Sequence, residues 1–142
     1  RGDDEYLVSL REEIKFAGSY LYLTKARFGQ AVDAIVEVPE KMMDLQIPPL
    51  SLQVILENII YTNALSKKEP LTIHIKALED HDLTITHSVH EKIIVQNFNQ
   101  DEGLDNLIIK YRLLGNQEIV ITEAPDHREI LLPLFHPEIA EA

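Results

Sequence analysis

The sequence contains no cysteine, and only 5 of its 142 residues are glycine and 7 are proline. The absence of cysteine excludes disulfide frameworks, thiolate zinc sites and thiol nucleophiles, so a metal would need histidine, carboxylate or amide ligands. Little glycine and proline, together with 45% hydrophobic residues, is typical of one packed globular domain. Apolar runs stay well short of the roughly 20 residues of a membrane span, so we expect a soluble domain.

Positive charge is also scarce, with 13 Lys and Arg against 24 Asp and Glu and a net charge of -11. Such a chain repels phosphate backbones and anionic membrane surfaces. We therefore expect neither nucleic acid nor a direct membrane contact. Because the chain begins with RGDDEY and lacks an initiator methionine, we also expect it to be part of a longer protein.

Three segments have the hydrophobic spacing of helices. Residues 9–29 open with Ser9 and Glu12 in a capping-box arrangement and carry apolar residues three and four apart. Residues 51–65 follow a Pro-Pro pair and are apolar around most of the helix, which predicts a largely buried position. Residues 104–115 end in glycine, a common helix stop.

Alternating apolar and polar residues predict strands that include two hairpins. The order of helices and strands favours an α/β fold of the α+β type, a two-layer sandwich with a mixed sheet of about five strands covered on one face by helices. The alternating segments are residues 31–38, 71–78, 82–89, 117–124 and 128–135, with residues 92–95 as a short continuation.

The segment IPPLSLQVILENIIYTNAL, residues 47–65, resembles the N-box helix of the LytS-type sensor histidine kinases, usually close to (V/I)PPLxLQxLVENAIKHN. EGLDNLIIKYRLLG, residues 102–115, is similar to that family's second glycine box, and ILLPLF to its closing strand. Residues 9–29 resemble the end of the dimerisation and phosphoacceptor region. The resemblance implies the Bergerat (GHKL) ATPase fold, with residues 1–30 as the C-terminal helix of the dimerisation region and residues 31–142 as the ATPase domain.

This resemblance implies the catalytic domain of a two-component sensor histidine kinase, which transfers the γ-phosphoryl group of ATP to a histidine and then to a response regulator. The first histidine, His74, lies in a predicted strand, so we expect the acceptor outside this chain. The implied cofactors are ATP and Mg²⁺. The implied partners are a second copy, bound through the N-terminal helix, and a response regulator, and the implied location is the cytoplasmic side of an inner-membrane protein.

The same resemblance implies roles for individual residues. Asn58 corresponds to the Mg²⁺ ligand that bridges the ATP phosphates, and Glu57 to a catalytic residue that orients a water. An amide oxygen suits this hard cation, although Asn58 taken without the flanking residues is more simply explained as a buried amide bonded to backbone. The other implied nucleotide-binding residues are Thr62, Gly103, Asn106 and Lys110, with Arg112 as an alternative contact to anionic groups.

Several positions depart from the family pattern. Tyr61 and Thr62 replace the usual Lys and His, and ITHSVHEK, residues 85–92, has neither the adenine-reading Asp nor a glycine and places His87 or Ser88 near the Asp position. The second box, residues 101–103, keeps one glycine and adds two carboxylates. We therefore expect weak or absent ATP binding. The alternative function is a degenerate, non-catalytic module for dimerisation or response-regulator docking.

Two other constellations are weak. His87 and His90 have the spacing of a metal pair, but residues three apart on a strand point to opposite faces. Ser88 beside a histidine has no acidic residue to orient the base. We interpret these side chains as solvated polar residues.

Overall fold

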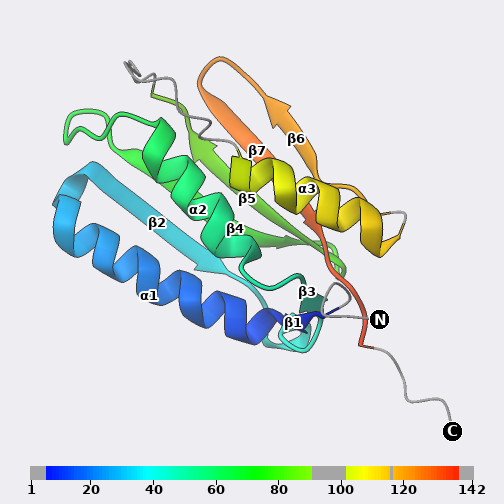
Figure 1. Ribbon diagram of the computed structural model, residues 1–142. Helices are drawn as coiled ribbons and strands as arrows, with labels where there is room; N and C mark the ends of the chain where they lie inside the picture. The colour runs from blue at the N-terminus through cyan, green and yellow to red at the C-terminus, as the bar shows by residue number, and fades with distance from the viewer. Residues whose placement is uncertain (1–5, 91–101, 116, 138–142) are drawn as a thin grey trace, which may run out of the picture.

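The computed structural model describes residues 6–90, 102–115 and 117–137. In these ranges the chain forms three α-helices and seven strands, which Figure 1 shows with the helices side by side on one face of the larger sheet. In chain order the elements are β1 (Val8–Ser9), α1 (Leu10–Phe28), β2 (Val32–Glu37), β3 (Gln46–Ile47), α2 (Ser51–Thr62), β4 (Leu71–Leu78), β5 (Asp82–Ser88), α3 (Glu102–Leu114), β6 (Val120–Glu123) and β7 (His127–Pro133), with single 3-10 turns at Gly29–Ala31 and Glu40–Met42.

The larger sheet has the strand order β2-β4-β5-β7-β6. β2 and β4 are parallel, whereas the β4–β5, β5–β7 and β6–β7 pairs are antiparallel, so the sheet is mixed. The predicted two-layer sandwich with a mixed five-stranded sheet is confirmed. The small β1–β3 pair, which joins Val8 to Ile47, was not predicted because two-residue strands are too short to show alternation.

Helix α1 begins and ends where its sequence predicts. The Ser9 hydroxyl accepts a hydrogen bond from the Glu12 N–H at 3.2 Å, and Gly29 ends the helix at a φ of 62°, which favours glycine. Its buried stripe includes Ala17 and Leu21, whereas Leu23 is 65% exposed. The helix packs against α2 and β2. It therefore lies in the same helical layer, while a domain boundary at residue 30 stays a prediction.

Helix α2 receives its N-terminal cap from another helix. Leu50 precedes the first turn at a φ of 69°, and no side chain at this cap position bonds the free N–H groups. Instead the carboxylate of Glu13, on α1, accepts hydrogen bonds from the Leu50 and Leu52 N–H groups at 3.0 Å each. Because an acceptor is required by the first N–H groups of any helix, Glu13 sets where α2 begins relative to α1.

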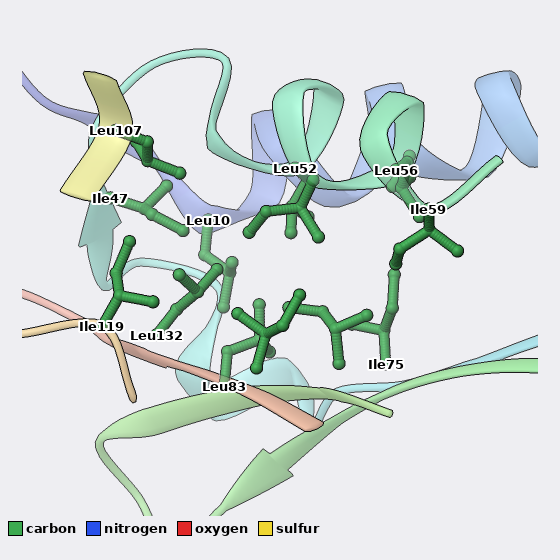
Figure 2. Close-up of a cluster of buried hydrophobic side chains, with 14 of the residues drawn as sticks. Leu10, Ile47, Leu52, Leu56, Ile59, Ile75, Leu83, Leu107, Ile119 and Leu132 are labelled. Atoms are coloured by element: carbon green, nitrogen blue, oxygen red, sulfur yellow. The ribbon is translucent and has the colours of Figure 1, made fainter. Parts of the chain in front are cut away.

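The core lies between the helices and the sheet. In Figure 2, Leu52, Leu56 and Ile59 of α2 point toward Ile75 and Leu83 of the sheet. All five side chains are fully buried, and burying each contributes about 1.5–3 kcal/mol. This apolar contact fixes α2 over β4 and β5. It thereby determines where the polar end of α2 meets the sheet.

Helix α3 is joined to the sheet by a buried tyrosine. Tyr111 is fully buried, and its hydroxyl donates a hydrogen bond to the Pro133 carbonyl at 2.9 Å. Burial raises the pKa of Tyr111, so the hydroxyl remains a donor. None of the helices in the described ranges has both the length and the hydropathy that a membrane crossing requires.

Candidate functional site

The second half of α2 carries the residues on which the predicted site depends. Adjacent residues of a helix point about 100° apart, and Glu57 is exposed while Asn58 is 5% exposed. The Glu57 Oε2 accepts a hydrogen bond from Gln53 Nε2 at 3.3 Å, within the helix. The Thr62 hydroxyl donates to the Asn58 backbone carbonyl at 2.7 Å, also within the helix. Of these residues, Asn58 is the one whose side chain is turned toward the sheet.

Arg128, on β7, lies between Asn58 and His87. Its Nη2 donates to Oδ1 of Asn58 at 2.7 Å, and its Nε donates to Nε2 of His87 at 2.9 Å. His87 and Arg128 are directly opposite in the β5–β7 register, so both side chains leave the sheet on the face that α2 covers. We call these three residues the polar cluster. They come from three elements that are distant in the sequence.

The hydrogen bonds of His87 define its protonation state. Nδ1 lies 2.7 Å from the Ser88 carbonyl, which can accept but not donate, so Nδ1 carries the proton. Nε2 must then accept from Arg128, since a guanidinium donates only. Burial lowers the pKa of His87 to about 4, and the charge of Arg128 acts in the same direction against the bond to Ser88. His87 is therefore neutral at pH 7 and 2% exposed, which corrects our interpretation of it as a solvated residue.

Two small cavities adjoin the polar cluster. One of about 160 Å³ is lined by Thr62, His87, Glu123 and Arg128 among others, and one of about 260 Å³ lies between α2 and α3. Both are below the roughly 300 Å³ at which pockets for drug-sized ligands begin. The residues lining the second cavity are Val54, Glu57, Asn58, Tyr61, Gly103 and Leu104. The structure thus brings together three predicted site residues, Glu57, Asn58 and Gly103.

The remaining predicted residues lie on α3. Gly103, Asn106 and Lys110 are three and four apart, so they share one side of the helix. Gly103 approaches α2 closely, because a Cβ at this position would lie 3.4 Å from Val54 Cγ1. Asn106 is exposed and Lys110 half-buried. Arg112 is exposed and lies 3.9 Å from Glu118, while Asp101 and residues 92–95 lie outside the described residues.

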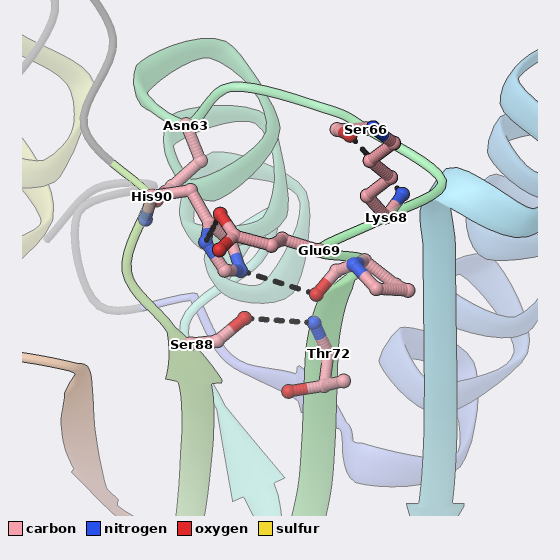
Figure 3. Close-up of polar contacts among 8 residues, drawn as sticks. Asn63, Ser66, Lys68, Glu69, Thr72, Ser88 and His90 are labelled. Carbon is pink, nitrogen blue, oxygen red and sulfur yellow. Dashed lines mark hydrogen bonds and ion pairs between the residues drawn. The ribbon is translucent and has the colours of Figure 1, made fainter.

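A second group of polar contacts joins the end of α2 to the end of β5 (Figure 3). The Asn63 side chain, 4% exposed, accepts from the His90 N–H at 2.7 Å and donates to the Ile59 carbonyl at 2.9 Å. The His90 ring faces the Pro70 carbonyl at 3.1 Å, and the Ser88 hydroxyl accepts from a backbone N–H of β4. His87 and His90 thus have separate hydrogen-bond partners.

The residues at Asn58 do not fit a divalent cation in this arrangement. Mg²⁺ takes oxygen ligands, usually one or two carboxylates together with substrate phosphates. The amide oxygen of Asn58 already accepts a hydrogen bond from the Arg128 guanidinium, which carries positive charge to the position predicted for the metal.

Sequence reasoning missed Arg128 and Glu13. Arg128, Ile130 and Leu132 alternate along β7 and point to the same face, so the pattern already places a charged residue on a core-facing position. That signal predicts a buried partner for Arg128, although it does not identify Asn58. Glu13 carries no comparable signal, because it is one of two adjacent glutamates in the first turns of a helix.

Comparisons with known proteins bear on the fold and the family. No protein-family model matches the chain. It is 28% identical to the uncharacterized protein YwpD of Bacillus subtilis, over 90% of this chain and 50% of that protein. It is 25% identical to the sensor histidine kinase/phosphatase LytS of Staphylococcus aureus, over 84% of this chain and 19% of that protein. The chain thus spans half or less of the length of these relatives.

Solved structures share the fold. The cytoplasmic segment of histidine kinase QseC matches over 92% of this chain and 78% of that chain, with a TM-score of 0.60 and 12% identity. The catalytic domain of histidine kinase ThkA matches over 89% and 93%, with a TM-score of 0.57 and 10% identity. The predicted resemblance to the LytS-type kinases is confirmed by the sequence comparison, and the predicted fold is confirmed by the solved structures.

Proposed function

We propose that this chain, a LytS-like domain with the fold of histidine kinase catalytic domains, is the ATP-binding domain of a two-component sensor histidine kinase. In the parent protein the γ-phosphoryl group of ATP would pass to a histidine outside this chain and then to a response regulator. Similarity to LytS over 84% of the chain supports this function. Such transfer depends mainly on positioning and electrostatics, so the domain contributes a cradle for the nucleotide rather than a nucleophile.

The cradle proposed here is formed by α2 and the first turns of α3. Gly103 lets α3 approach Val54 of α2, and Asn106 and Lys110 continue along the same side of α3. Lys110 would contact anionic groups, and Glu57, exposed at the mouth of the cavity between α2 and α3, would orient a water. Asn58 is the deepest of these residues and is bonded to Arg128.

We further propose that magnesium–ATP binds weakly or not at all, which favours the degenerate module as the second candidate function. The observation that carries this proposal is the 2.7 Å hydrogen bond from Arg128 to the side-chain oxygen of Asn58. In addition, His87, which stands near the position of the adenine-reading Asp, is neutral and bonded on both ring nitrogens. Loss of a charge-assisted hydrogen bond alone costs about 1.5–3 kcal/mol, or roughly one to two powers of ten in affinity.

Calorimetric titration with a non-hydrolysable ATP analogue and Mg²⁺ tests this proposal. If an intact relative bound at about 10 μM, the lost contacts would place this chain at about 1 mM or weaker. A dissociation constant below about 50 μM would contradict the proposal that the site has lost its affinity for magnesium–ATP. Lys110→Gln should weaken any binding that uses the proposed cradle, whereas Lys15→Gln, on the exposed face of α1, should not.

We also propose that the parent kinase dimerises through the N-terminal helix, and that its domain lies on the cytoplasmic side of the membrane. Tyr22 and Leu23 of α1 are 75% and 65% exposed and supply an apolar surface for a second copy. Light scattering of the wild type should show a dimer that Leu23→Glu dissociates, whereas Lys67→Glu, in the exposed loop after α2, should leave it intact. A wild-type monomer at millimolar concentration would contradict dimerisation through this helix.

A further inference from the structure

The polar cluster places the positive charge of Arg128 beside the side-chain oxygen of Asn58. Arg128 is held from two sides, by the Asn58 oxygen at 2.7 Å and by His87 Nε2 at 2.9 Å. The proton of His87 is committed to the Ser88 carbonyl, so its Nε2 remains an acceptor and keeps the guanidinium in this orientation. The cluster therefore depends on residues of α2, β5 and β7 that bond one another, and not on a single surface side chain.

The backbone determines where this charge lies. His87 and Arg128 face each other in the ladder between β5 and β7, both of which continue into the apolar core through Ile85 and Ile130. Asn58 is held on a helix whose neighbouring residues, Leu56 and Ile59, are fully buried. Neither partner can withdraw from Arg128 without a change of rotamer in a packed region. The contact is thus part of the folded state.

A guanidinium and a divalent cation compete for this oxygen. A Mg²⁺ ion binds oxygen at about 2.0–2.1 Å and demands nearly octahedral geometry, so at Asn58 it would face the guanidinium at only about 4 Å. Two like charges so close repel each other strongly in a partly buried site. A guanidinium, in contrast, is weakly hydrated and forms charge-assisted hydrogen bonds to phosphate oxygens. The charge needed beside a phosphate is therefore already present.

We propose that Arg128 takes the place of the divalent cation at Asn58, so that a phosphate-bearing ligand of this site binds without magnesium. This inference rests on the proposed nucleotide site. It assigns to Arg128 a binding function that the resemblance does not imply, and to His87 the function of positioning Arg128. The affinity of ADP for the domain is then independent of Mg²⁺, whatever its absolute value.

The test compares ADP titrations in excess EDTA and in excess Mg²⁺, followed by NMR of the ¹⁵N-labelled domain to detect millimolar binding. For the wild type, Mg²⁺ should change the affinity less than twofold. Arg128→Gln keeps a donor for Asn58 but removes the charge, and it should bind ADP at least fivefold more tightly with Mg²⁺ than with EDTA. Arg128→Lys keeps the charge and should stay insensitive to Mg²⁺. Arg27→Gln, exposed at the end of α1, is the matched control and should behave as the wild type.

A second readout follows the metal directly. Mn²⁺ with ADP should broaden the Asn58 side-chain amide signals in Arg128→Gln and leave them sharp in the wild type. If Arg128→Gln does not fold, the ADP affinities of Arg128→Lys and of the wild type, each with Mg²⁺ and with EDTA, are compared instead. A fivefold or larger gain with Mg²⁺ in the wild type, an Arg128→Gln variant that folds without gaining Mg²⁺ dependence, or ADP binding by none of the proteins would overturn the inference. Tight binding that ignores Mg²⁺ would contradict the proposed weakness of the site while supporting this inference.

Discussion

The two halves of α2 meet the same sheet in different ways. Around Leu52 and Leu56 the contact is apolar and fully buried against β4 and β5, whereas at Asn58 it includes a directed hydrogen bond from Arg128 of β7. Apolar burial is non-directional and tolerates other residues of similar volume. A buried polar contact needs each donor and acceptor in place. The apolar half therefore determines that the layers stay together, and the polar half determines what the site can bind.

The largest effect is expected from breaking the apolar half. Leu56→Ala removes a fully buried side chain from the core and should lower the free energy of unfolding by about 2–5 kcal/mol. Urea denaturation measures this change. Leu113→Ala, at a position of α3 that is 80% exposed, is the matched control and should cost less than about 0.5 kcal/mol. Equal costs for both variants would show that the core is not where we place it.

The pH dependence of stability tests the contribution of His87, which holds Arg128 beside Asn58. The pKa of His87 is lowered from 6.5 to about 4 in the folded state, so between these values the unfolded chain binds more protons. His87 therefore contributes stability at pH 7 that is lost as the pH falls from about 6.5 to about 4, by at most about 3 kcal/mol. Denaturation of the wild type and of His87→Gln across this range should show a shallower decline for the variant, whereas His136→Gln, at an exposed position, should follow the wild type.

Removing the amide at the centre of the polar cluster comes next. Asn58→Ala deprives Arg128 of an acceptor on a mostly buried helix and should lower the free energy of unfolding by about 1–3 kcal/mol. Thermal denaturation without ligand should record a drop of several degrees. An unchanged melting temperature would argue that Asn58 faces an open pocket. Asn106→Ala, on the exposed side of α3, provides the matched comparison.

The smallest effect concerns the cap that sets the start of α2. Glu13→Gln keeps one acceptor and loses the other, so one of the two N–H groups of Leu50 and Leu52 loses its partner, at a cost of about 1 kcal/mol. Glu12→Gln, on the exposed side of α1, should change the free energy of unfolding much less. Amide exchange at Leu50 and Leu52 should accelerate only in the Glu13 variant. Protection that stays unchanged there would show that these N–H groups have another acceptor.

The sequence by itself determined the elements of the larger sheet and the helices, because their signals are local. Ser9 and Glu12 predicted the start of α1, Gly29 its end, and alternation predicted β4, β5 and β7 to within a few residues. The N-box resemblance pointed to Asn58, and the resemblance to the second glycine box pointed to Gly103, Asn106 and Lys110. Each of these signals lies within one short stretch of the sequence.

Only the tertiary structure decided what Asn58 and α2 contact. Arg128 lies 70 positions from Asn58. Glu13 lies 37 and 39 positions from Leu50 and Leu52, whose N–H groups donate hydrogen bonds to it. Contacts at this separation follow from the strand order β2-β4-β5-β7-β6 and from the β5–β7 register, which hydrophobic periodicity does not encode, since it shows which face of an element is buried but not against which partner. Folding therefore determined that a positive charge stands at Asn58, and with it the chemistry that the site admits.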